Sequence, residues 1–164
     1  MVRIVGLTIA LAIVAYIAFA TDEFRLSDDP VIMIADDDKQ MNAAIARARE
    51  TLPVFWKVKR NLVAGQSSLS LKVEITDGDA VEHFWLMDII EQGDGYTGTI
   101  ANTPQSVGNV KEGQRYSFPA TDITDWMYMQ NDKIYGGYTI RVLVDKMPKD
   151  EGEKLKAVLA YEPD

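Results

Sequence analysis

The chain has 164 residues, of which 47% are hydrophobic, enough for one domain with a substantial core and too few for two domains of ordinary size. It contains no cysteine, which excludes disulfide bonds, thiolate metal sites and a cysteine nucleophile. Its formal net charge of −8 makes nucleic acid and anionic lipid poor partners, because a strongly acidic surface repels both.

The first twenty residues have the pattern of an export signal. Arg3 precedes an uncharged, mostly apolar run from Ile4 to Ala20, and small residues stand at positions 18 and 20. This pattern is typical of a secretory signal, so we interpret residues 1–20 as a signal peptide. The alternative is an uncleaved N-terminal membrane anchor, because the apolar run approaches the length that spans a bilayer. Both interpretations predict an exported domain, either periplasmic or anchored to the membrane outside the cytoplasm.

Residues 21–35 are predicted to form a polar tether that ends in a short apolar strand over residues 31–35. The rest of the chain, residues 36–164, is predicted to be a single domain without internal repeats. Removal of the signal peptide would take away Arg3 and make the net charge one unit more negative than −8.

The domain begins with an amphipathic helix, predicted over residues 38–51. Asp37 and Gln40 form a capping-box arrangement at its start, and apolar residues then recur at helical spacing. Pro53 is expected to interrupt this helix. The following segment, residues 54–60, suits either a second helical piece or a strand.

Short strands separated by turns dominate the middle of the chain. We expect them over residues 69–76, 81–90, 96–101, 114–118, 125–130 and 133–135. Turns rich in aspartate and glycine, at residues 77–79 and 93–95, join the first three strands into a meander.

The strand over residues 81–90 is expected to be central, because both of its faces are apolar in the middle. At the two-residue period of a strand, one face carries Val81, His83, Trp85, Met87 and Ile89. The other face carries Glu82, Phe84, Leu86, Asp88 and Ile90.

Two glycines, Gly136 and Gly137, break the strand pattern near the C-terminus. A helix is slightly favoured over a strand for residues 138–145, and Pro148 opens a last helix over residues 149–159. The predicted fold class is α+β. We expect one strongly bent antiparallel sheet, similar to a meander or small barrel, with an N-terminal amphipathic helix and a C-terminal helix.

Several stretches resemble the YegJ-like family of bacterial proteins, a family of unknown function numbered 2314. The resemblance covers about residues 36–147, through Met41 to Ile45, Thr51 to Pro53, Glu82 to Leu86, Gly93 to Ile100, Asp122 to Tyr128 and Gly136 to Thr139. It implies a bacterial setting and these domain boundaries, and no catalytic residue or cofactor follows from it.

His83 is the only histidine and the one side chain that titrates near neutral pH without perturbation. It can act as a general base oriented by a nearby aspartate, or it can be a buried core residue held by one hydrogen bond. Its apolar neighbours on the strand favour the second interpretation.

A single histidine without cysteine makes a zinc site unfavourable. The acidic clusters lack the EF-hand pattern, and no phosphate-binding loop or serine nucleophile motif occurs, so no metal and no cofactor is predicted.

The remaining candidate for recognition is aromatic. We predict a non-catalytic binding module that contacts a protein or a cell-envelope component through a sheet face containing His83, Trp85, Asp122, Trp126 and Tyr128. The same aromatic residues can instead form the core of a small sheet. Tyr128 and Tyr135 flank a hairpin turn, so these two are expected to reach solvent most readily.

Two alternatives stay open. One is a small hydrolase that uses His83 with Asp122 or Asp125. The other is an acidic inhibitor or immunity-like protein that blocks a basic partner. The sequence leaves the oligomeric state and the ligand undetermined.

Overall fold

The structure is a computed structural model that describes residues 6–10, 31–35 and 38–160. Most of the predicted signal peptide, the tether over residues 21–30 and the capping residue Asp37 lie outside the described residues. The elements in chain order are β1 (Gly6–Ala10), β2 (Val31–Ala35), α2 (Lys39–Arg60), β3 (Gln66–Asp77), β4 (Ala80–Gln92), β5 (Gly95–Ile100), β6 (Arg115–Pro119), the 3₁₀ turn η1 (Ala120–Asp122), β7 (Ile123–Gln130), β8 (Lys133–Gly136), α3 (Tyr138–Val144) and α4 (Lys149–Val158).

Helix α2 is longer than predicted, because Pro53 lies inside it rather than at its end. The helix begins after Asp38, whose carboxylate accepts hydrogen bonds from the backbone N–H groups of Gln40 and Met41, both at 3.0 Å. A proline within a helix removes one backbone hydrogen bond and is costly in isolation. Here Ala48 and Phe55 pack into the core on either side of Pro53, so tertiary contacts hold the two halves in one helix.

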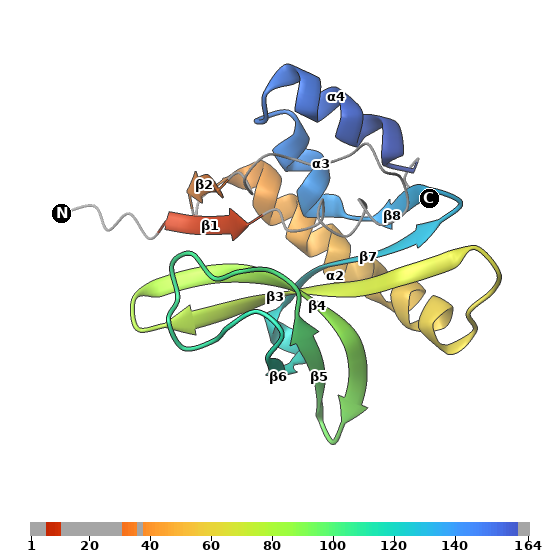
Figure 1. Ribbon diagram of the computed structural model, residues 1–164, viewed down its shortest axis with the longest axis horizontal. Helices are drawn as coiled ribbons and strands as arrows, with labels where there is room; N and C mark the ends of the chain where they lie inside the picture. Colours follow the sequence, from red (N-terminus) through yellow and green to blue (C-terminus); the bar gives the residue numbers. More distant parts are fainter. Residues whose placement is uncertain (1–5, 11–30, 36–37, 161–164) are drawn as a thin grey trace.

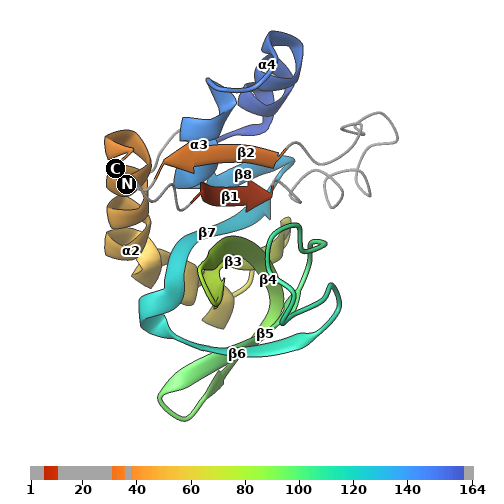
Figure 2. The ribbon, with the colours of Figure 1, turned by 90° about the vertical axis from the view of Figure 1, so that its left-hand side faces the viewer.

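Six of the strands form an antiparallel sheet in the order β6-β5-β4-β3-β7-β8. The expected meander of β3, β4 and β5 is confirmed, but the expected strong bend and barrel-like closure are wrong. The sheet stays open because, among the described strands, β6 pairs only with β5 and β8 only with β7. Figure 2 shows the β5–β6 end of the molecule lying opposite α4.

Two further strands, β1 and β2, extend the described sheet beside the N-terminal part of β4. Strand β1 pairs parallel with β4 at Thr8–Glu82 and Ile9–His83, and β2 pairs antiparallel with β1. The apolar run of residues 31–35 was predicted as a strand, which is confirmed, whereas a strand at residues 6–10 was not predicted.

Both faces of the sheet are covered, as expected for its central strands. One core cluster joins β3, β4 and β7 to α2 and includes Phe55, Val73 and Trp126. A second cluster joins Trp85 and Met127 to α3 and α4. Figure 1 shows α3 and α4 gathered on the same side of the molecule, away from β5 and β6. Helix α3 confirms the helical alternative for the segment after the two glycines.

A β-bulge at Asp88 changes the predicted faces of β4. The pairing of β4 with β5 shifts between Met87 and Ile90, and Asp88 has a positive φ of 51°. Ile89 therefore joins the cluster that contains Leu86, and Ile90 is 56% exposed. The prediction that Ile89 shares a face with Trp85 is wrong, because strict alternation ends at the bulge.

None of the helices in the described part of the chain is long and apolar enough to span a membrane.

Candidate functional site

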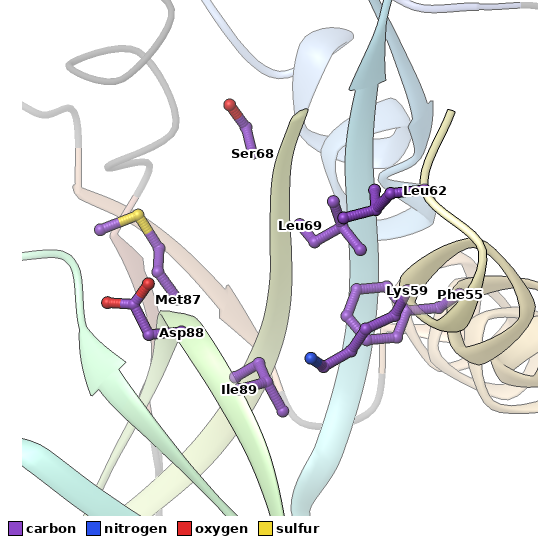
Figure 3. Close-up of a pocket in the computed structure, with 8 residues that line it drawn as sticks. All are labelled: Phe55, Lys59, Leu62, Ser68, Leu69, Met87, Asp88 and Ile89. Carbon is purple, nitrogen blue, oxygen red and sulfur yellow. The ribbon is translucent and has the colours of Figure 1, made fainter. Parts of the chain in front are cut away.

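A groove of about 230 Å³ lies between the C-terminal half of α2 and the bulged segments of β3 and β4. We call it the α2–β3–β4 groove. Figure 3 shows the residues that line it: Phe55, Lys59, Leu62, Ser68, Leu69, Met87, Asp88 and Ile89. Three segments that are separated in sequence therefore meet at one concave surface.

Backbone irregularities shape two walls of the groove. Ser68 has a φ of 54°, and the pairing of β3 with β7 shifts register between Ser67 and Ser70. Asp88 has a φ of 51° at the bulge of β4. A left-handed backbone is uncommon for residues other than glycine and costs about 1 kcal/mol or more, so surrounding contacts must maintain it. Such outliers cluster at functional sites, and here two of them face the same groove.

Contacts from β5 and β6 hold the Asp88 bulge in place. The Arg115 guanidinium donates a hydrogen bond of 3.0 Å to the Asp88 backbone carbonyl. The Thr99 hydroxyl lies 3.4 Å from the Asp88 carboxylate, and Arg115 also donates to the Thr97 hydroxyl at 2.6 Å. Side chains from neighbouring strands thus hold the backbone carbonyl and the carboxylate of Asp88 in place, so they stabilise its left-handed conformation.

The groove combines an apolar floor with one cation, Lys59 on α2, and one anion, Asp88 on β4. Phe55 and Ile89 are almost fully buried beneath it, while Leu62 on the rim is 56% exposed. In Figure 3 the Lys59 ammonium points from α2 toward the β4 side. In the part of the chain that the structure describes, no hydrogen bond or ion pair joins this ammonium to another residue. The groove can therefore accept an apolar group and offer a positive charge beside it.

The structure places His83 away from this groove and buries it, with 2% of its surface exposed. Its Nδ1 lies 2.9 Å from the Thr124 hydroxyl, and its Nε2 lies 3.7 Å from the Glu74 carboxylate, too far for a hydrogen bond. Burial, together with the positive charges of Lys72 and Arg49, lowers the pKa of His83 to about 3. The ring is neutral at physiological pH, and the interpretation as a buried core histidine fits this environment.

The predicted aromatic recognition surface is instead part of the core. Trp85 is 2% exposed, Trp126 0% and Tyr128 6%, so the expectation that Tyr128 reaches solvent is wrong. Trp126 donates from its indole nitrogen to the backbone carbonyl of Ala48 at 3.0 Å. Tyr128 stacks against Trp126 and against Tyr135, with ring centroids 6.1 Å and 5.1 Å apart. These contacts use the aromatic faces that a ligand would need, which supports the alternative that the residues form the core.

The two aspartates considered as partners for His83 have other roles. Asp122 is half-buried at the end of η1 and accepts a hydrogen bond from the Thr121 hydroxyl at 3.0 Å. Asp125 is fully buried and accepts from the backbone N–H groups of Trp126, Tyr138 and Thr139 and from the Thr139 hydroxyl. The structure therefore brings neither carboxylate into hydrogen-bond contact with His83.

A buried lysine, which the sequence analysis did not single out, lies beside Asp125. The Lys72 ammonium donates to the Thr139 hydroxyl at 3.0 Å and lies 5.3 Å from the centroid of the Trp85 ring. In the sheet Lys72 is directly opposite Asp125. Lys72 lies between Leu71 and Val73 on β3, and Thr139 of α3 covers its side of the strand.

The buried Lys72 predicts an increase in stability at alkaline pH. Burial lowers the pKa of its ammonium from 10.5 to about 8, against the opposing effect of Asp125. Between these pH values the unfolded chain binds more protons at this group than the folded protein does, so the free energy of unfolding rises with pH. The rise is of order 3 kcal/mol. It is measured by urea unfolding at several pH values between about 8 and 10.5.

The matched control for this measurement is Lys72→Met, which keeps the apolar stem and removes the ammonium. The two proteins differ in no other ionisable side chain, so the difference between their pH profiles isolates Lys72. Parallel profiles for the two proteins would contradict the prediction.

The groove residues were missed by sequence analysis, because no motif joins positions on α2, β3 and β4. The one local signal was an apolar pair after the helix, Leu62 and Val63, both more than half exposed. Among the described residues there is no cluster of three or more metal-ligating side chains.

Comparisons with known proteins place the chain in a family. The family model described as "Uncharacterized protein conserved in bacteria (DUF2314)" matches residues 38–161. The chain is 37% identical over 149 residues to "Uncharacterized protein YegJ" of Escherichia coli strain K12, covering 91% of this chain and 96% of that protein. It is also 31% identical over 134 residues to a Neisseria meningitidis serogroup B protein named "Putative ankyrin repeat protein", covering 77% of this chain and 53% of that relative.

No solved structure matches the chain. The family match extends over the whole α+β domain, from the N-cap of α2 to the end of the described residues, and the resemblance noted in the sequence is confirmed. The chain therefore belongs to the DUF2314 family of bacterial proteins.

Proposed function

We propose that this protein is an exported, non-catalytic binding module that recognises a protein partner through the α2–β3–β4 groove. The observation that carries the proposal is the meeting of two strained residues, Ser68 and Asp88, with Lys59 at one concave surface. Within the described residues Lys59 forms no ion pair. Export rests on the leader pattern of residues 1–20, and binding rests on the groove.

The size of the groove favours one side chain over a whole small molecule. Small-molecule and cofactor sites occupy about 300–1,000 Å³. The groove measures about 230 Å³, below that range. A branched apolar side chain of a peptide fits such a space, with its backbone continuing along the rim beside Leu62.

Charge complementarity defines the partner further. Lys59 provides a cation on the α2 side of the apolar floor, and Asp88 provides an anion on the β4 side. A ligand carboxylate is therefore favoured on the α2 side of the apolar anchor, next to Lys59. We therefore propose that the ligand is an extended peptide segment in which a leucine or isoleucine is adjacent to a glutamate or aspartate.

A relative supports a role in recognition. In the Neisseria protein, the region similar to this chain accounts for 53% of a longer chain named as an ankyrin repeat protein. Ankyrin arrays are extended concave binding surfaces. A domain in a chain that carries this name fits a function in binding.

The two alternatives differ in their support. A hydrolase needs an open His83 beside an acid, whereas His83 is buried and hydrogen-bonded to Thr124 with a low pKa. An acidic inhibitor of a basic protein rests on the net charge of −8 alone.

The proposed function is tested by peptide titration with charge reversal. The probes are N-acetyl-Leu-Glu-amide and N-acetyl-Leu-Lys-amide. Their binding is measured from the NMR chemical-shift changes of the backbone amides of Lys59, Ser68 and Asp88. The acidic probe is expected to bind about threefold more tightly, since an exposed charge pair contributes about 0.2–1 kcal/mol. Lys59→Glu is expected to reverse this preference.

The matched control is Lys57→Glu, which makes the same charge change on α2 at an exposed position that does not line the groove. It should leave the preference for the acidic probe intact. Equal binding of the two probes by the unaltered protein, or shifts confined to residues outside the groove, would contradict the proposal.

A further inference from the structure

Strands β3 and β4 pair with each other along only part of their lengths. Their antiparallel register ends at the pair Leu71 and Leu86. Beyond this pair β3 continues as residues 66–70 beside β7, and β4 continues as residues 87–92 beside β5. Figure 1 shows β4 curving toward β5 while β3 runs on with β7. In the described sheet these two continuations form a fork, and the edges that face each other across it are not paired with each other.

The bulges at Ser68 and Asp88 explain why the strands separate. Each bulge inserts one extra residue into its strand just beyond the last β3–β4 pair. A bulge bends its strand and increases the local twist, so the two strands turn away from each other. The α2–β3–β4 groove lies in this fork, with Leu69 on the β3 side, Ile89 on the β4 side and Phe55 of α2 at the floor. Two walls of the groove are therefore strand edges.

The backbone groups of Glu91 point into the fork rather than toward β5. Gln92 and Gly95 are opposite each other across the two-residue turn of the β4–β5 hairpin, where the flanking pair exchanges backbone hydrogen bonds. Pro119 of β6 is opposite Gly95 and has no N–H, which fits a Gly95 whose backbone groups face β4. Hydrogen-bonded and non-hydrogen-bonded pairs alternate along an antiparallel ladder, so the next pair, Glu91 and Tyr96, is not hydrogen-bonded. The N–H and C=O of the exposed Glu91 therefore face the fork.

An extended peptide is the ligand that suits both the edge and the groove. A free strand edge binds a further strand through backbone hydrogen bonds, and pockets beside it select the side chains. Here the apolar floor of Phe55 and Ile89 accepts an apolar side chain. Lys59 on the α2 side attracts a carboxylate, and Asp88 on the β4 side repels one. The charges thus define how the side chains of the peptide are placed, and the edge defines its backbone conformation.

We propose that the fork is a strand-acceptor site, in which the peptide of a partner protein binds as an added strand and pairs with the edge of β4 at Glu91. This inference rests on the proposed function for the identity of the side chains. It adds that the main chain of the peptide carries part of the affinity, so the ligand must be extended and must have free backbone N–H groups.

The proposal is tested first by changing the backbone of the peptide. The probe is N-acetyl-Thr-Leu-Glu-Thr-amide, and the control peptide has the same side chains with N-methyl groups on the leucine and glutamate nitrogens. Adjacent N–H groups of a strand point to opposite edges, so one of these two faces β4 in either register. The unmethylated probe is expected to bind about fivefold more tightly, measured by NMR titration, since it keeps a hydrogen bond that the control lacks. At saturation it should slow hydrogen exchange of the Glu91 amide about tenfold.

The second test changes the backbone of the protein. Glu91→Pro removes the N–H that faces the fork and leaves the ladder with β5 intact, whereas Glu91→Ala removes the same side chain and keeps the N–H. The proline variant is expected to bind the probe about fivefold more weakly than the alanine variant. The matched control is Ser117→Pro, at an exposed position two residues before Pro119 on β6. Its N–H faces the free edge of β6, away from β5, so binding of the probe should be unchanged.

Equal binding of the two peptides, or equal binding by the proline and alanine variants, would overturn the proposal. If the preference for an acidic probe persisted in that case, the proposed function would stand and only strand addition would fail; absence of binding by both peptides would overturn both. A Glu91 amide protected from exchange without peptide would also overturn it, because the fork would then be filled by the chain itself or, if protection grew with protein concentration, by a second copy. If Glu91→Pro does not fold, the comparison of the two peptides on the unaltered protein decides.

Discussion

Asp125→Ala is expected to lower the free energy of unfolding by about 3–5 kcal/mol, because it breaks a buried ionic network. The Asp125 carboxylate accepts four hydrogen bonds, at 2.8 Å from Trp126 N–H, 3.1 Å from Tyr138 N–H, 2.8 Å from Thr139 N–H and 2.6 Å from the Thr139 hydroxyl. Alanine leaves those donors unpaired, and it leaves the Lys72 ammonium without its opposite charge.

The position of Asp125 explains the size of this effect. Its carboxylate satisfies the first backbone N–H groups of α3, so it ties β7 to the start of that helix. Burial raises the pKa of Asp125, while Lys72 and the hydrogen bonds from Thr139 and Trp126 oppose the rise. The Asp125 carboxylate is therefore stable in the core only while Lys72 and its hydrogen-bond donors are all present.

Urea unfolding of Asp125→Ala and of Asp122→Ala tests this expectation. Asp122 is half-buried and accepts a hydrogen bond from the neighbouring Thr121, so its loss should cost less than about 1 kcal/mol. The double variant of Asp125→Ala with Lys72→Met should lose less than the two single variants added together, because the pair is coupled. A loss below about 1 kcal/mol for Asp125→Ala would refute the assigned role.

Gly136→Ala is expected to destabilise the protein by at least about 3 kcal/mol. Gly136 has a φ of 75°, a conformation that costs other residues about 1–2 kcal/mol. A β-carbon there would overlap the Trp126 carbonyl oxygen and lie 2.6 Å from Cε3 of the Trp126 ring. Neither neighbour can move readily, because that carbonyl accepts from the Gly137 N–H at 2.8 Å and the ring is fully buried.

Two other glycines provide matched controls. Gly78 and Gly93 have φ values of 60° and 58°, and a β-carbon at either would meet no atom within 4 Å. Alanine at these turns should cost only the backbone strain, about 1–2 kcal/mol. Thermal or urea unfolding of the three variants separates strain from overlap, and an equal loss at Gly78 and Gly136 would show that the contact with Trp126 is unimportant.

Local sequence was sufficient where neighbouring residues alone set the conformation. The strand expected over residues 69–76 matches β3, and the turns expected at residues 77–79 and 93–95, which contain Gly78 and Gly93, lie on either side of β4. The break at Gly136 predicted the change from strand to helix. In each case the periodicity, or a glycine that tolerates a positive φ, acts within a few residues.

Local sequence was misleading where contacts from distant segments override it. Pro53 predicted a helix end, but the packing of Ala48 and Phe55 carries α2 across it. Asp88 gave no sign of a positive φ, which depends on hydrogen bonds from Thr99 and Arg115 on β5 and β6. The closed sheet expected from a run of short strands is open, because closure requires edge strands to meet and β6 and β8 do not.

The same division applies to the candidate sites. His83, Trp85, Trp126 and Tyr128 were selected because their side chains are chemically versatile, and sequence cannot tell whether such groups face solvent or the core. The structure buries all four. The α2–β3–β4 groove escaped prediction because Lys59, Leu69 and Asp88 become neighbours only when their three elements pack together.

By itself, then, the sequence determined the family, the α+β class, the positions of most strands and helices, and the absence of cysteine chemistry, since these follow from composition and local periodicity. Only the tertiary structure decided which aromatic residues are buried, that Lys72 and Asp125 share one network, and where a concave surface forms. The reason is physical: burial and pairing depend on residues far apart in the chain, and no local pattern records the register in which their strands and helices meet.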